Sequence, residues 1–165
     1  MKKFILALLV ALPMSVFAQK FAHVNSATII QSMPEYTTAQ TELQTLAKQY
    51  EDDLKGMQDE LQAKSDLYEK SMATDPEPVK QRKQQELQDL SQRFQQFYQT
   101  SQQALAKAEQ ERMNAITEKV KKAINEVGVA GGYVYIMDVT SGIPFINETL
   151  STDVTAQVKA KLGLK

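Results

Sequence analysis

The 165-residue chain contains no cysteine and only one histidine, His23. Without cysteine the protein has no disulfide framework, no thiol nucleophile, no lipid-anchoring cysteine and no cysteine-bound metal. A lone imidazole in a strand needs carboxylate partners to bind zinc, and no spacing in the sequence suggests them. We therefore expect no metal and no other cofactor, and we expect stability to come from helix pairing or from subunit association.

Motifs for nucleotide binding and for nucleophilic catalysis are also missing. The sequence has no Gly-x-Ser-x-Gly elbow and no Walker-type lysine. The glycine-rich segment 128–132 follows a predicted helix, so the negative end of the helix dipole faces it and a phosphate would be repelled. The acidic runs 51–53 and 59–60 point in different directions on a helix and do not converge as catalytic carboxylates must. We therefore expect that the protein is not an enzyme.

Long apolar runs are confined to the N-terminus. Lys2 and Lys3 precede the apolar run 4–12, and Val16 and Ala18 are small residues at the −3 and −1 positions before Gln19. This pattern predicts a signal peptide, residues 1–18, cleaved after Ala18. The run is too short to cross the hydrocarbon core of about 30 Å as a helix. The mature protein is therefore expected to be exported.

The charge balance of residues 19–165 is slightly acidic, with 17 basic and 20 acidic side chains. Nucleic-acid-binding domains are strongly basic, so we expect no nucleic-acid partner. An anionic membrane surface is not an obvious partner either.

Residues 34–73 have the pattern of a long coiled-coil helix, which Pro34 would begin. Apolar residues recur mostly three and four positions apart. They are Tyr36, Ala39, Leu43, Leu46, Tyr50, Leu54, Met57, Leu61, Tyr68 and Met72. Two successive steps of four, Leu46 to Tyr50 to Leu54, form a stutter that would unwind the supercoil locally.

A second long helix is predicted after a turn at residues 73–78, where two prolines stop the first. Its seam residues follow a strict three-four alternation: Leu87, Leu90, Phe94, Phe97, Ser101, Ala104 and Ala108. The pattern continues less regularly to Val127. Two such helices joined by a short turn predict an antiparallel hairpin, residues 34–127, whose arms are about 57 Å and about 75 Å long.

The two ends of the chain, residues 19–33 and 128–165, are expected to form one small α/β body. We predict a strand at 21–24, a helical stretch at 26–32, a helix stop at Gly128 and a strand at 133–137 with both faces covered. A second strand at 143–146 and a last helix capped by Asp153 and ended by Gly163 would follow. The predicted fold class is mainly α, a long antiparallel coiled-coil hairpin inserted in a small α/β oligomerisation domain.

Such a body is too small to be stable alone, because domains near 60 residues bury only about 60% of their surface. Self-association is therefore expected. The candidates for the contact between subunits are Phe21, Val24, Tyr133, Tyr135, Ile136 and Phe145.

Not all apolar residues of the hairpin can lie in its single seam. Phe97 and Tyr98 are adjacent, and Leu105 lies one position off the seam line. Methionine and tyrosine are suited to loose contact with varied partners. The candidates for partner contact are Tyr50, Met57, Tyr68, Met72, Phe97, Tyr98 and Leu105.

The chain resembles the Skp/OmpH family of periplasmic chaperones. The resemblance lies in two segments, 21–31 and 133–155, and in the order signal, split body and hairpin. It implies a homotrimer whose hairpins surround a cavity. It also implies an ATP-independent holding chaperone of the periplasm, which binds unfolded outer-membrane proteins and prevents their aggregation in transit.

The hairpin departs from the best-known members, whose arms are strongly basic. Residues 34–127 hold 13 basic and 17 acidic side chains. Contact with a membrane or with lipopolysaccharide therefore stays open. The alternative function is a structural coiled-coil adaptor or spacer of the cell envelope, which would bind one folded partner at the tip near Pro76.

Overall fold

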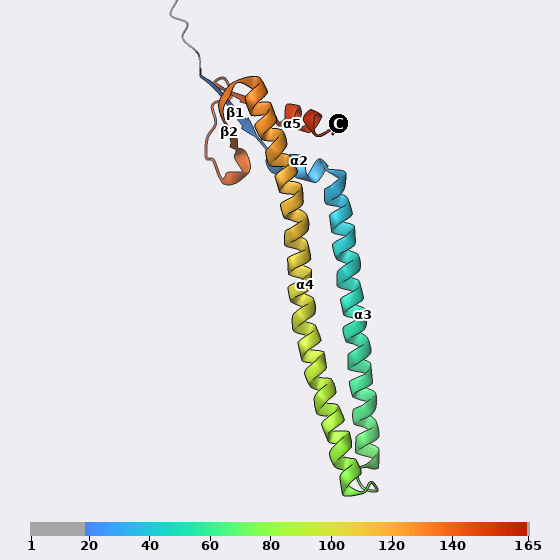
Figure 1. Cartoon of the computed structure of the whole chain (residues 1–165). Coiled ribbons are helices and arrows are strands. Elements are labelled where there is room, and N and C mark those ends of the chain that lie inside the picture. The colour runs from blue at the N-terminus through green and yellow to red at the C-terminus, as the bar shows by residue number, and fades with distance from the viewer. Residues whose placement is uncertain (1–18, 165) are drawn as a thin grey trace, which may run out of the picture. The chain divides into compact units, whose positions relative to one another are not determined.

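The computed structural model describes residues 19–164, so the predicted signal peptide lies outside the described residues. The element order is β1 (Lys20–Val24), α2 (Ser26–Ser32), α3 (Pro34–Ser71), α4 (Glu77–Gly131), β2 (Tyr133–Asp138), the 3-10 turn η1 (Val139–Ser141), β3 (Ser151–Asp153) and α5 (Thr155–Lys161) (Figure 1). This mainly helical fold with a long hairpin and a small sheet confirms the predicted fold class. Two compact units are present: Thr28–Lys121, and the rest of the described chain.

The helical unit is an antiparallel hairpin in which α3 and α4 lie side by side (Figure 1). Met33 has extended backbone angles, as a residue before proline should, and Pro34 occupies the first turn of α3 as predicted. A short turn after Ser71 leads to α4, where Pro78 is the second residue. The buried apolar residues of the two long helices in this unit are Ala39, Leu90, Ile116 and Val120.

The other unit contains a parallel three-stranded sheet in the order β2-β1-β3. Its buried apolar residues are Ala22, Val24, Ala123, Val127, Val154 and Val158. Parallel sheets are normally covered on both faces. Here Tyr135 is 51% exposed and Met137 is 44% exposed. The described residues therefore do not supply the expected cover on both faces of β2.

The end of the second long helix is a correction to the sequence analysis. The helix does not stop at Gly128 but continues to Gly131, and the residue with a positive φ, +65°, is Gly132. Gly128 lies inside the helix, where an added Cβ would be 3.4 Å from Cδ1 of Ile136. Gly128 is the first glycine of a glycine-rich run, but the helix ends only where Gly132 adopts the left-handed conformation.

The third strand is a second correction. Residues 143–146 form no strand, and β3 is instead the polar segment Ser151–Asp153. Pro144 lacks the N–H that a strand ladder needs. β3 is held at the edge of β1, because the amide of Val154 donates to the carbonyl of His23 at 2.9 Å.

The last helix begins and ends much as expected. The carboxylate of Asp153 accepts hydrogen bonds from the amide of Thr155 at 2.8 Å and from its hydroxyl at 2.6 Å. The N-cap residue itself is Val154, one position further on. Gly163, with φ of +74°, follows the end of α5 as predicted.

Candidate functional site

Ion pairs between the two arms of the hairpin are grouped at its two ends. Near the start of α3, Lys119 contacts Glu35 and Arg112 contacts Glu42, each at 3.0 Å. Near the turn, Lys64 pairs with Glu86. Among the described residues no ion pair joins the two arms between these groups. The central part of the seam therefore depends on apolar contacts and shape alone.

The ion pairs lower the pKa values of the carboxylates that take part in them. A bond from its own backbone amide lowers the pKa of Glu35, and the bond from Lys119 lowers it further. The bond from Lys64 likewise lowers the pKa of Glu86. Glu35, Lys119 and Glu86 are about half in solvent and Lys64 about one third, and pairs exposed to this extent contribute little to stability.

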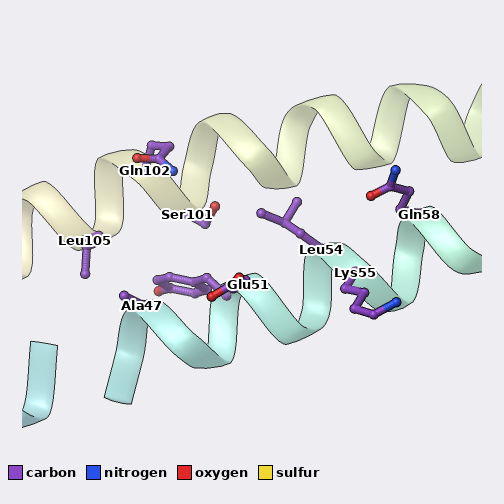
Figure 2. Close-up of a pocket in the computed structure, with 9 residues that line it drawn as sticks. Ala47, Glu51, Leu54, Lys55, Gln58, Ser101, Gln102 and Leu105 are labelled. Atoms are coloured by element: carbon purple, nitrogen blue, oxygen red, sulfur yellow. The ribbon is translucent and has the colours of Figure 1, made fainter. Parts of the chain in front are cut away.

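The centre of the hairpin contains a solvent-open hollow of about 570 Å³. Figure 2 shows Leu54 pointing from α3 toward α4, and Ser101 on the facing side of α4. The hollow is lined by Ala47, Tyr50, Glu51, Leu54, Lys55, Gln58, Ser101, Gln102 and Leu105. We call the space lined by these nine residues the central hollow.

Two features of the sequence account for the central hollow. Ser101 is only 3% exposed and occupies a seam position, yet its side chain is too short to reach across. Its hydroxyl donates to the carbonyl of Tyr98 at 2.9 Å, so the polar group is satisfied within its own helix. On the facing arm the stutter from Leu46 to Leu54 interrupts regular seam packing.

The central hollow is bordered by an aromatic contact and by charged side chains. Tyr50 stacks edge-on against Phe97 of α4, with ring centroids 6.0 Å apart. The rim carries both signs of charge, from Glu51 and Lys55. Lys55 donates to Asp59 at 2.8 Å, and this bond raises its pKa.

The seven predicted contact residues are placed differently from one another. Tyr98 and Met72 are exposed, and the other five are half-buried. Tyr50 and Leu105 line the central hollow, and Tyr68 lines a smaller one near the turn. Leu54 and Ser101 of the hollow were predicted only as seam residues and not as contact residues, and Leu67, which is 63% exposed, was in neither set. The short Ser101 in a strict seam pattern was the signal that could have located the hollow.

A second apolar surface lies on the sheet-containing unit. A hollow of about 210 Å³ is lined by Phe21, Tyr135, Met137, Ile143, Phe145, Ile146, Asn147, Leu150 and Ser151. The rings of Phe21 and Tyr135 are 4.9 Å apart between centroids. Three of the six predicted association residues therefore lie together here: Phe21, Tyr135 and Phe145.

The other three predicted association residues lie elsewhere in the same unit. Tyr133 and Ile136 are half-buried, and they lie near Gly131 and Gly128 respectively. Val24 is buried and belongs to the core of a single chain. His23 shares a hydrogen bond of 2.9 Å with the hydroxyl of Ser151, an ordinary structural role for a strand histidine.

Residues 19–164 also lack features of a metal site and of a membrane span. No three acidic or histidine side chains within that range gather in a way that could hold a metal ion. In the same range no helix is long and apolar enough to cross a membrane.

Comparison with known proteins gives matches that cover most of the chain. The model of the family described as outer membrane protein (OmpH-like) matches residues 20–162. A curated relative, the chaperone protein Skp of Yersinia enterocolitica, is 27% identical over 156 residues, which are 93% of this chain and 94% of the relative. The crystal structure of a candidate OmpH-like outer membrane chaperone from Caulobacter crescentus superposes with a TM-score of 0.75. It is 18% identical and covers 87% of this chain and 83% of the other, so it shows a shared fold.

Proposed function

The chain belongs to the OmpH-like outer membrane protein family, and on that premise we propose that it is an ATP-independent holding chaperone of the periplasm. It binds unfolded outer-membrane proteins and prevents their aggregation during transit. The name of the Yersinia relative, a chaperone protein, supports this function. The sequence supports ATP independence, because it contains no phosphate-binding loop.

The observation that carries the proposal is a two-helix hairpin that leaves apolar side chains uncovered. Two helices share only one seam, and besides α3 and α4 the unit Thr28–Lys121 contains only part of the short helix α2. Leu67, Met72 and Tyr98 are therefore exposed, and the central hollow is open to solvent. Many weak apolar contacts of this kind suit a holding chaperone, since a client held at one strong site could not be handed on.

The proposal includes export and assembly. Residues 1–18 act as a signal peptide cleaved after Ala18, residues 19–33 and 128–165 form the association body, and residues 34–127 form the client-binding hairpin. The body joins three chains into a homotrimer. The exposed Tyr135 and Met137 on β2, beside Phe21, support association of the body.

The test is an aggregation experiment without nucleotide. A urea-denatured outer-membrane β-barrel is diluted into buffer with and without residues 19–165, and light scattering is followed. We expect scattering to be suppressed at a few-fold molar excess, and added ATP to change nothing. Undiminished scattering at that excess would reject the function.

The adaptor alternative is favoured by one observation, the exposed Leu67 and Met72 near the turn between the arms. An adaptor that docks a single folded partner there would lose activity when the turn, residues 72–76, is replaced by an unrelated turn sequence. The holding chaperone keeps its suppression of scattering after this exchange. The same light-scattering assay therefore separates the two functions.

A further inference from the structure

We propose that the central hollow is a client subsite, in which alternate apolar side chains of an extended outer-membrane protein segment are buried between the two arms of one hairpin. The inference rests on the proposed function and names the place and the chemistry of capture. It concerns the space between α3 and α4 within one chain.

The size of the central hollow fits several side chains. Its volume of about 570 Å³ lies within the range of ligand pockets. Along α3 it extends from Ala47 to Gln58, which is roughly 16 Å of helix axis. Side chains on one face of an extended strand repeat about every 7 Å. Two or three of them can therefore enter together.

The chemistry of the lining favours apolar occupants over charged ones. Tyr50, Leu54 and Leu105 present apolar surface. The charges of Glu51 and Lys55 lie at the rim, and Lys55 is already paired with Asp59. Strands of outer-membrane barrels alternate apolar and polar side chains. The apolar set would enter the hollow, and the polar set would stay in water beside the polar rim.

The helices also limit how a client can bind. The hollow lies in the interior of α3 and α4, where each backbone amide is already bonded to the carbonyl four residues earlier. Strand addition through main-chain hydrogen bonds is therefore excluded at this site. Binding through side chains alone depends on the alternation of apolar and polar residues in a client segment and not on its particular sequence.

The decisive variant fills the hollow. Ser101→Leu places a large apolar side chain at a seam position that a short serine now occupies. The hairpin should therefore become more stable, with Tm raised by about 2–4 °C. Affinity for a fluorescently labelled, urea-denatured β-barrel should fall about tenfold, because the replaced space no longer accepts client side chains. Ala108→Leu adds the same side chain to the same helix two turns away and should bind as the wild type does.

The outcomes separate the inference from the proposed function. If Ser101→Leu binds the client as tightly as the wild type does, the hollow is a packing defect and the inference is wrong. If the wild type itself fails to bind, the holding function is wrong. Circular dichroism at 222 nm checks that both leucine variants keep their helices.

A second measurement does not depend on the folding of Ser101→Leu. Because the chain has no cysteine, Gln102→Cys can carry one polarity-sensitive fluorophore at the rim, and Gln88→Cys can carry it at an exposed control position. Denatured client should shift the emission to the blue at residue 102 only. An equal shift at both positions, no shift at residue 102, or a client-free shift that grows with protein concentration would each overturn the inference. The last result would identify a second copy of the chain as the occupant.

Discussion

Asp138, at the end of β2, joins three parts of the sheet-containing unit through its carboxylate. It accepts bonds from the hydroxyl of Ser26 at 2.5 Å, from the amide of Ser26 at 3.3 Å and from the amide of Thr140 at 3.1 Å. Burial raises the pKa of Asp138, but the bonds from Ser26 and Thr140 together outweigh it and lower the pKa below its ordinary value. The folded state is therefore stabilised by the ionised form.

We predict that Asp138→Ala lowers the free energy of unfolding by about 1–2 kcal/mol at pH 7, the value of a charge-assisted hydrogen bond that is partly in solvent. Because the pKa of Asp138 is lowered on folding, this contribution is present above the ordinary aspartate pKa of about 3.9 and is lost as the pH falls through the folded value. Urea unfolding between pH 7 and pH 3 measures it. A difference between wild type and variant that does not shrink in acid would contradict the assignment.

The aromatic pair of the hairpin offers a test of side-chain coupling between the arms. Tyr50 and Phe97 meet edge-on beside the central hollow. We predict a coupling free energy of about 0.5–1.5 kcal/mol in a double-mutant cycle of Tyr50→Ala and Phe97→Ala. Denaturant unfolding of the four proteins measures it. Additive effects of the two substitutions would show that the rings do not stabilise each other.

At the scale of elements, the end of α4 distinguishes two glycines that look alike in the sequence. Gly132→Ala forces a side chain into the left-handed conformation, and we predict a loss of about 1 kcal/mol in the free energy of unfolding. Gly128→Ala keeps a helical conformation and meets Ile136 at an ordinary contact distance, so we predict no loss. Thermal unfolding of the two variants compares them. Equal destabilisation would contradict the position of the helix end.

The long elements could be predicted from the sequence because they are periodic. Spacing of three and four over many residues predicts α3 and α4, Pro34 marks the start of α3, and the two prolines at 76 and 78 mark the turn between the helices. The short elements follow from contacts distant in sequence. Ser151–Asp153 becomes a strand because it pairs with β1, register Phe21 to Ser151, and no local preference of serine or aspartate predicts this.

Only some of the candidate contact residues could be predicted from the sequence. Adjacency of Phe97 and Tyr98 correctly implied that they face different directions, and Tyr98 is the exposed one. The central hollow depends on which residues of two distant segments face each other, Leu54 and Ser101. Periodicity within each helix does not fix which residues of the two helices lie opposite each other.

At the scale of the whole molecule, the sheet-containing unit leaves several large apolar side chains exposed to water. The sheet has two edges, and β2 is one of them. Tyr135, Met137, Phe145 and Leu150 surround a hollow that no residue of the described range 19–164 fills. A small body without disulfides or metal is marginal alone. Association of several chains through this surface would supply the missing cover.

We predict that residues 19–165 sediment as a trimer, with three times the mass of one chain, and that Met137→Glu shifts the mass toward a single chain because a charge would be buried at the contact. Met137 is 44% exposed in one chain, so the substitution leaves the core of that chain intact. Gln157→Glu adds the same charge on α5 and should remain trimeric. Analytical ultracentrifugation measures the mass, and circular dichroism checks the fold.

Assembly and holding can then be tested together. If a trimer is needed to surround a client, Met137→Glu should lose suppression of light scattering while its helices persist, and diluting the wild type until it dissociates should have the same effect. Affinity gained by several hairpins acting on one client disappears when they are no longer joined. A monomeric Met137→Glu that still suppresses scattering fully at equal chain concentration would show that a single hairpin is sufficient, and the need for a shared cavity would be rejected.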